Sequence, residues 1–255
     1  MASRIKFDLT DQVAFITGAT SGFGERFAEI LSDAGAKVVI TGRRAQRLST
    51  VKQKIERSGG KCFALPIDVT NVAQIKETVA EAEQLAGPIS ILVNNAGLNI
   101  QSSVTGLSEA DYDTIMDTNV KGMFFVAQAV AERMLHHKTK GRIVNIASIG
   151  ALKPLPGLVA YSMSKAAVGM MTKGMAREWA RHQIAVNAMC PGFIKTELNA
   201  DWFATEGGQK QVSSFPRRRL GTESDLDALL LLLCSEHAGF ITGSLFTIDD
   251  GQVLT

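Results

Sequence analysis

Residues 17–24 read Thr-Gly-Ala-Thr-Ser-Gly-Phe-Gly, and this stretch decides the fold. A short apolar run, Val13–Thr17, precedes it, and an amphipathic run, Gly22–Ala34, follows it. Glycines permit positive φ values and close backbone approach, and a helix N-terminus attracts anions. The order strand, glycine turn, helix predicts a parallel α/β fold with a place for a dinucleotide diphosphate. Because the spacing is G-x-x-x-G-x-G rather than G-x-G-x-x-G, an ordinary tight turn is the alternative.

Short apolar runs alternate with longer amphipathic runs along the rest of the chain, which is typical of a parallel sheet with crossover helices. Further strands are predicted at Lys37–Thr41, Cys62–Pro66, Ile89–Val93, Arg142–Ala147, Ile184–Cys190 and Leu245–Ile248. Further helices are predicted at Ala45–Arg57, Val72–Leu85, Glu109–His136, Ala160–Arg181 and Ser224–Ser235. The pattern predicts a doubly wound, mostly parallel sheet of seven strands with helices on both faces.

The longest stretch without clear periodicity runs from Gly192 to Thr222. A segment of that length is more typical of a functional loop than of a plain connection. No repeat, low-complexity linker or charge block interrupts the pattern. We therefore expect one catalytic and dinucleotide-binding domain over residues 1–255, with a lid at about residues 192–222.

The composition is that of an ordinary globular protein, with 45% hydrophobic and 20% charged residues among 255 and a formal net charge of +2. This charge gives no reason to expect a nucleic-acid or membrane-surface partner. Cys62, Cys190 and Cys234 lack metal-ligand spacing, so no metal site is expected and the thiols are interpreted as buried apolar groups. The first residues lack a signal-peptide core, and the aliphatic run Leu229–Leu233 is too short to span a bilayer. A cytoplasmic protein is expected.

Tyr161 and Lys165 stand four residues apart on a predicted helix, which places both side chains on one face. An ammonium beside a phenol lowers the phenol pKa from about 10 toward neutrality. Such a tyrosine can exchange a proton with an alcohol or ketone oxygen. Taken alone, the pair is also compatible with a solvated surface contact.

Arg43 and Arg44 follow Gly42 at the end of the second predicted strand. An NAD-selective site of this architecture has an acidic residue there, which accepts a hydrogen bond from the ribose 2′-hydroxyl. Arginines can instead hold a 2′-phosphate. The residues therefore favour NADP(H) over NAD(H), and the alternative is that the two arginines simply begin a solvated helix.

Taken in order, the motifs resemble the short-chain dehydrogenase/reductase family over nearly the whole chain, from Thr17 to Gly251. The motifs that carry the resemblance are Gly18 with Gly22 and Gly24, Asp68-Val69, Asn94-Asn95-Ala96-Gly97, Asn119, Ser148, Tyr161 with Lys165, Pro191-Gly192 and Asp250-Gly251. The resemblance implies a single Rossmann domain and hydride transfer between a nicotinamide cofactor and a ketone or secondary alcohol. It also implies that 3-oxoacyl thioesters are a leading substrate sub-class.

The resemblance implies a catalytic role for four residues. Tyr161 is expected to be the general acid or base, and Ser148 to hydrogen-bond the substrate oxygen. Lys165 is expected to bind the nicotinamide ribose and lower the Tyr161 pKa. Asn119 is expected to hold a water that links Lys165 to solvent.

The resemblance further implies which residues bind the cofactor. They are Gly18, Thr20, Ser21, Gly22, Phe23, Gly24, Arg43, Arg44, Asp68, Val69, Asn95, Ala96, Gly97, Tyr161, Lys165, Pro191, Gly192, Phe193, Ile194 and Thr196. Two positions depart from the family pattern. Phe23 stands where an isoleucine is usual, and Gln252 follows Asp250-Gly251 where a second glycine is more frequent.

The substrate and the assembly are less constrained. Apolar residues at 152–159 and aromatics within 193–215 could wall a pocket or simply pack the long segment. Arg217, Arg218 and Arg219 could attract a carrier phosphate or remain a solvated basic stretch. On resemblance, a homotetramer or dimer is expected, and Met170, Met171, Met175 and Trp179 suit either its interface or the core. A non-catalytic dinucleotide-binding sensor or scaffold is the alternative function.

Overall fold

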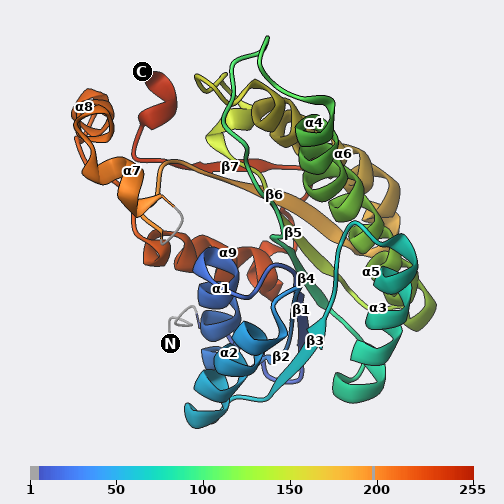
Figure 1. The fold of residues 1–255 in the computed structure, drawn as a ribbon. Coiled ribbons are helices and arrows are strands. Elements are labelled where there is room, and N and C mark those ends of the chain that lie inside the picture. The colour runs from blue at the N-terminus through green and yellow to red at the C-terminus, as the bar shows by residue number, and fades with distance from the viewer. Residues whose placement is uncertain (1–5, 197–198) are drawn as a thin grey trace.

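The computed structural model describes residues 6–196 and 199–255, which form a seven-stranded sheet with helices on both faces (Figure 1). The strands are β1 Val13–Ile16, β2 Lys37–Gly42, β3 Cys62–Pro66, β4 Ile91–Asn94, β5 Arg142–Ile146, β6 Ala185–Pro191 and β7 Leu245–Ile248. Every neighbouring pair is parallel, and the order is β3-β2-β1-β4-β5-β6-β7. The order reverses between β1 and β4, which is where such sheets bind ligands. The predicted fold is confirmed.

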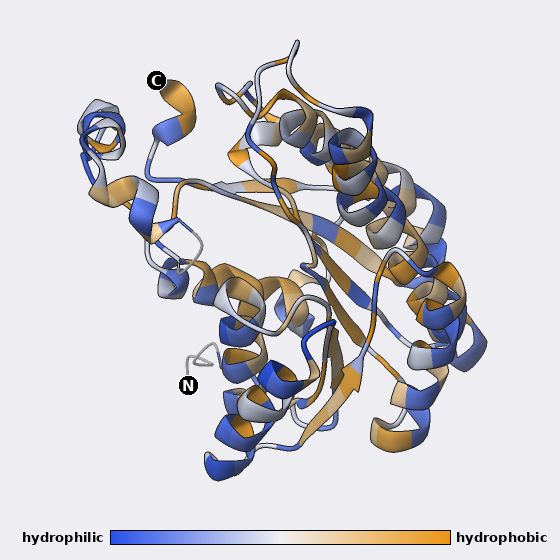
Figure 2. Ribbon diagram, in the orientation of Figure 1, coloured by the Kyte–Doolittle hydropathy of each residue, from blue (hydrophilic) through white to orange (hydrophobic). Residues whose placement is uncertain are grey.

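Burial on both faces explains why the central strands are almost continuously apolar. In β1, Ala14 and Ile16 face one core cluster, whereas Val13 and Phe15 face another. The first cluster packs under α1 Gly22–Asp33, α2 Ala45–Arg57 and α9 Asp227–Cys234. The second packs under α3 Val72–Ala86, α5 Met123–His137 and α6 Val159–Trp179. Apolar ribbon accordingly concentrates in the strands, and hydrophilic residues lie on the outer helix faces (Figure 2).

Several predicted segments differ from the structure. The predicted helix Ser224–Ser235 begins as the 3-10 turn η4 Glu223–Leu226 and continues as α9, and the predicted helix Ala160–Arg181 is α6 followed by the 3-10 turn η3 Ala180–His182. The predicted helix Glu109–His136 consists of α4 Glu109–Met116, a π-helical segment η1 Asp117–Gly122, and α5. The predicted lid contains two helices, α7 Ala200–Ala204 and α8 Glu206–Ser214, which were not predicted from the sequence. Both helices are too short for a clear helical period, and residues 197–198 of the predicted lid lie outside the described residues.

The glycine turn is held by close backbone contacts. Gly18 and Gly22 have φ values of +67° and +57°, which favour glycine. At Gly24, an added Cβ would lie 2.3 Å from Gly18 O and 2.8 Å from Gly18 C. Gly24 therefore allows α1 to begin directly against the turn.

Gly24→Ala should destabilise the protein by about 2 kcal/mol or more, because the methyl group meets backbone that must shift. Gly174→Ala is the matched control, since Gly174 is exposed in α6 and an added Cβ meets nothing within 4 Å. The control should stabilise the protein by about 0.5–1 kcal/mol through helix propensity. Urea unfolding measures both, and a neutral Gly24→Ala would show that the turn is not tightly packed.

Candidate active site

The glycine turn and the end of β4 are joined by hydrogen bonds. Thr17 Oγ1 accepts from Asn95 N at 2.9 Å and from Ala96 N at 3.0 Å, and Asn95 Nδ2 donates to Thr17 O and Gly18 O. An added Cβ at Gly18 would lie 2.9 Å from Ala96 Cα. The structure thus brings together Gly18, Asn95 and Ala96, which we predicted from separate motifs.

The start of α1 fits a diphosphate group. Ser21 is the N-cap residue, and its side chain makes no capping hydrogen bond to the helix. An added Cβ at Gly22 would meet only Glu223 Oε1, at 3.8 Å. Uncapped first-turn N–H groups beside an open glycine backbone are the usual donors to a dinucleotide diphosphate.

The two predicted arginines lie differently at the end of β2. Arg44 donates from Nε to Thr20 Oγ1 at 3.1 Å and from Nη2 to Ser21 Oγ at 2.8 Å, so it supports the glycine turn. Arg43 is exposed beside it. No acidic residue ends β2, because its last residue is Gly42.

Asp68 and Val69 follow β3, the edge strand on the β2 side of the sheet. Asp68 Oδ1 accepts from the Thr70 N–H and hydroxyl groups, and Val69 is buried. Their place beyond β1 and β2 suits the adenine end of a dinucleotide that extends along the carboxyl edge of the sheet.

Asn119 joins three elements and lies completely buried within η1. Its carboxamide accepts from Leu98 N at 2.8 Å and donates to Leu98 O at 2.8 Å. It also donates to Ser164 Oγ at 3.0 Å, and Ser164 Oγ in turn donates to Tyr161 O at 2.7 Å. This chain of bonds fixes the start of α6, and π-helical turns of this kind often occur at functional sites.

Lys165 is 4% exposed, and its Nζ donates to Ile146 O at 2.8 Å. The ammonium lies 5.7 Å from the centroid of the Tyr161 ring. Burial lowers the Lys165 pKa to about 8. Lys165 therefore remains largely protonated at pH 7 but titrates within reach of physiological pH.

Ser148 follows β5, and its hydroxyl accepts from Gly150 N at 3.0 Å. Burial raises the pKa of Tyr161, and a hydrogen bond from Ser148 opposes this shift. We predicted a lowered Tyr161 pKa, so the expected direction is wrong for the protein in this state. The physical reason is that the loss of hydration around the phenol outweighs the hydrogen bond from Ser148.

The segment after β6 begins at the carboxyl edge of the sheet, next to the end of β5. Pro191 ends β6, Phe193 N donates to Gln252 Oε1 at 2.7 Å, and Thr196 N donates to Asn199 Oδ1 at 2.8 Å. Ile194 is buried and bridges to Gly221.

The aromatic residues of the predicted lid pack mainly on one another. The Phe193 ring is stacked on Phe215 at 5.4 Å between centroids and meets Phe203 edge-on at 6.0 Å. Phe203 and Phe215 are buried, whereas Trp202 is exposed. These ring contacts therefore attach α7 and α8 to the segment that contains Phe193.

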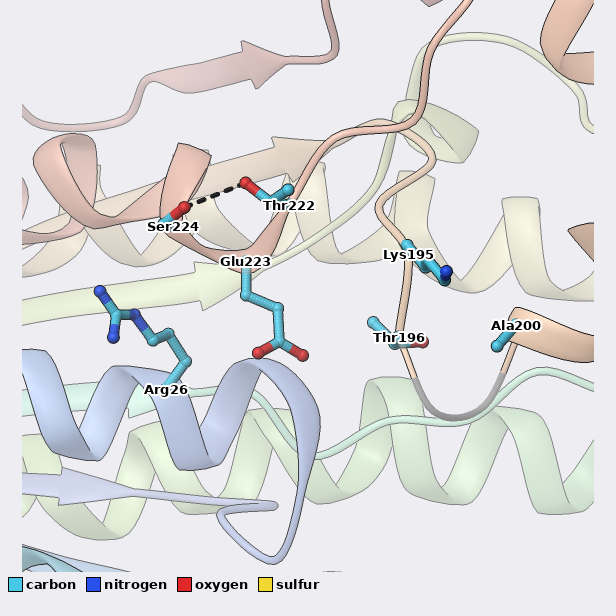
Figure 3. Close-up of a pocket in the computed structure, with 7 residues that line it drawn as sticks. All are labelled: Arg26, Lys195, Thr196, Ala200, Thr222, Glu223 and Ser224. Atoms are coloured by element: carbon cyan, nitrogen blue, oxygen red, sulfur yellow. Dashed lines mark hydrogen bonds between the residues drawn. The ribbon is translucent and has the colours of Figure 1, made fainter.

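A cavity of about 640 Å³ opens beside the start of α1 (Figure 3). Arg26 of α1, Lys195 and Thr196 after β6, Ala200 of α7, and Thr222, Glu223 and Ser224 line it. The Glu223 carboxyl group points into this space, and burial raises its pKa. A second cavity of about 380 Å³ lies between residues 100–112 and the start of α6, and neither cavity is lined by Ser148, Tyr161 or Lys165.

Within the described residues, no helix is long and apolar enough to cross a membrane. In the same part of the chain, no group of three or more His, Cys, Asp and Glu side chains could hold a metal ion.

Sequence reasoning missed Ser164, Glu223 and Gln252. Ser164 could have been found, because it lies three residues after Tyr161 in the same motif and a turn of helix places it nearby. Glu223 and Gln252 approach the site from the far end of the chain, and no local pattern reveals such contacts.

A doubly wound parallel sheet with a Ser-Tyr-Lys cluster at its carboxyl edge is typical of dinucleotide-dependent oxidoreductases. The family model for short chain dehydrogenases matches residues 12–207. The chain therefore belongs to the short-chain dehydrogenase family, whose members are NAD(P)-dependent oxidoreductases acting on CH–OH groups.

Individual relatives cover the chain almost completely. It is 36% identical to gluconate 5-dehydrogenase of Gluconobacter oxydans over 96% of both chains. It is 34% identical to 3-oxoacyl-[acyl-carrier-protein] reductase of Thermotoga maritima over 96% of this chain and 99% of that one. The crystal structure of a gluconate 5-dehydrogenase from Burkholderia cenocepacia, in complex with NADP and tartrate, aligns with a TM-score of 0.93 at 32% identity over 98% of both chains.

Lys165→Met should raise the Tm by a few degrees at pH 7, because it removes a buried charge. Folding lowers the Lys165 pKa from 10.5 to about 8, which costs on the order of 3 kcal/mol below pH 8. The lost bond to Ile146 offsets part of the gain.

The gain should shrink as the pH rises from about 8 to 10.5, because the folded wild type releases its proton before the unfolded chain does. Thermal unfolding across this range measures the trend. Lys173→Met, on the exposed face of the same helix, is the control. A gain that does not depend on pH would contradict the assignment of a buried charge.

Proposed function

We propose that this protein transfers a hydride between a nicotinamide cofactor, preferably NADP(H), and a ketone or secondary alcohol, with Tyr161 as general acid and base. The observation that carries the proposal is the cluster of Ser148, Tyr161 and Lys165 beside the switch point of the sheet. When bound, the cofactor supplies the hydride. The glycine turn and the uncapped start of α1 support a dinucleotide along the carboxyl ends of the strands.

In the reduction direction, the Tyr161 hydroxyl gives its proton to the carbonyl oxygen as negative charge develops there. The Ser148 hydroxyl donates a hydrogen bond to the same oxygen and stabilises that charge. The Lys165 ammonium favours the phenolate that Tyr161 becomes after the transfer. In the oxidation direction the phenolate accepts the proton from the alcohol.

Asn119 suits the role of holding a water beside Lys165. A Cβ added at Gly97 would lie 3.2 Å from Asn119 Oδ1 and 3.3 Å from Lys165 Nζ. Both polar atoms thus lie against the backbone of Gly97, close to each other. A water that reaches both groups would accept from Lys165, donate to Asn119 Oδ1, and link the ammonium to solvent.

Tyr161→Phe should reduce turnover by at least about two orders of magnitude, because it removes the proton donor. NADPH binding should change little. Initial rates at the nicotinamide absorbance band, together with cofactor titration, measure both quantities. Near-normal reduction by the variant would contradict the assigned role. Wild type that binds cofactor but turns over no carbonyl compound in a broad panel would instead favour the sensor or scaffold.

Preference for NADP(H) is supported by the end of β2. Gly42 offers no carboxylate to a 2′-hydroxyl, and Arg43 is exposed next to it. Arg44 supports Thr20 and Ser21, so it acts on the turn that serves either cofactor. The NADP in the Burkholderia relative agrees with this preference.

Arg43→Ala should therefore lower kcat/KM with NADPH about 10- to 100-fold and barely change kcat/KM with NADH, since one charge-assisted contact contributes about 1.5–3 kcal/mol. Arg44→Ala should lower kcat/KM with both cofactors. Gly42→Asp should reverse the preference by attracting the 2′-hydroxyl and repelling the phosphate. Gly42→Ala is its steric control, because an added Cβ would lie 2.7 Å from Thr20 Cγ2. Wild type that favours NADH would refute the NADP assignment.

For the substrate, the relatives support small hydroxy acids and 3-oxoacyl thioesters as the two classes to test first. Arg217 and Arg219 both pair with Asp250, at 2.9 Å and 2.7 Å. This pairing reduces their support for a carrier phosphate, so we place hydroxy and keto acids of sugar type ahead of acyl carriers.

Self-association, as a homotetramer or dimer, is supported by exposed apolar side chains on adjacent helices. Tyr112 of α4, Phe124 of α5, and Met163 and Met170 of α6 are each more than one third exposed. By contrast, Met175 is buried in the core and Met171 and Trp179 pack on it, so only Met170 of that predicted set remains available to a partner.

A further inference from the structure

Gln252 lies in the C-terminal helical turn η6 Gln252–Leu254 and is only 2% exposed. Its Oε1 accepts a hydrogen bond from Phe193 N at 2.7 Å. An added Cβ at Gly192 would lie 2.5 Å from the same oxygen. The side-chain amide is thus pressed against the backbone that follows Pro191. Because bulk water does not reach this site, no solvent molecule readily replaces the acceptor.

The backbone of Gln252 reaches a second segment of the site. Its carbonyl oxygen accepts from Lys153 Nζ at 3.1 Å, and Lys153 N donates to Ile149 O at 3.0 Å. Lys153 Nζ also donates to Thr255 O. Gln252 therefore connects the segment after Ser148 with the segment after Pro191.

The turn that carries Gln252 is anchored by other residues. Asp249 accepts from Gly251 N at 3.0 Å and from Val253 N at 2.6 Å. Asp250 pairs with Arg217 and Arg219. The turn is therefore fixed by contacts of its own, and from it the Gln252 side chain reaches Phe193 N.

We propose that Gln252 is a positioning residue for the nicotinamide half of the cofactor. Its amide oxygen fixes the Phe193 peptide, and through it the segment from Phe193 to Thr196. This inference rests on the proposed function, in which that segment binds the nicotinamide end. The adenine end lies across the sheet near Asp68 and Arg43, where Gln252 makes no contact that the structure records.

The test is Gln252→Met, which keeps the side-chain length and removes the acceptor. Titration calorimetry should show NADPH and NADH binding about tenfold more weakly, the scale of one buried donor left unpaired. The adenine-end fragments adenosine 2′,5′-bisphosphate and AMP should bind within twofold of wild type. Gln252→Glu, which retains an acceptor oxygen, should restore most of the dinucleotide affinity.

Asn187→Leu, in β6, is the matched control, because Asn187 is also a buried carboxamide that accepts from a backbone N–H group. The Asn187 carboxamide donates to Ile241 O at 2.9 Å and accepts from Ser244 N at 3.1 Å, toward the other end of β6. The Asn187→Leu variant should have a lower Tm and an unchanged ratio of dinucleotide to fragment affinity.

Equal weakening of dinucleotides and fragments by Gln252→Met would overturn the inference and leave a purely structural residue. Unchanged dinucleotide affinity would overturn it as well. If Gln252→Met does not fold, the ratio of dinucleotide to fragment affinity in Gln252→Glu decides the matter. Because Gln252→Glu keeps the acceptor oxygen, a tenfold drop in its ratio would contradict the role of the acceptor. Wild type that binds neither dinucleotide would refute the proposed function itself.

Discussion

The buried ammonium group of Lys165 is the constraint on which the rest of the site depends. A charge removed from water is costly unless nearby polar groups compensate it. Here the Ile146 carbonyl accepts a hydrogen bond from the ammonium, and the Tyr161 ring lies beside it. Asn119 Oδ1 lies next to Gly97, as the ammonium does. The protein keeps a buried charge that lowers its stability. Such an exception to the rule that charges stay in water is expected at a functional site.

The fold places this ammonium through contacts between elements that are distant in sequence. Asn119 bonds both backbone groups of Leu98 after β4 and the hydroxyl of Ser164 on α6. The π-helical turn at Asp117–Gly122 brings the Asn119 carboxamide into that position. The parallel sheet then places Ser148, after β5, at the same carboxyl edge. Each predicted catalytic group thus depends on a rigid neighbour, which favours a preorganised site.

The sheet and its order of elements could be predicted because strands buried on both faces are continuous apolar runs that turn residues interrupt. The glycine turn was likewise local, since Gly18, Gly22 and Gly24 lie within seven residues. Other features depend on the tertiary structure. The helices α7 and α8 form where Phe203 and Phe215 pack on Phe193, and the raised Tyr161 pKa reflects burial that a helical spacing does not encode. The contact of Gln252 with Phe193 spans 59 residues of sequence.

The most direct test is a titration of the lysine side chains by NMR in protein labelled at lysine Cε, with Lys165→Met used to assign the resonance. We expect the Lys165 resonance to titrate with a midpoint near pH 8, the value to which burial lowers the Lys165 pKa. If the Lys165 resonance instead titrates near the ordinary lysine value of about 10.4, the ammonium is not buried beside Tyr161, and the central claim is contradicted.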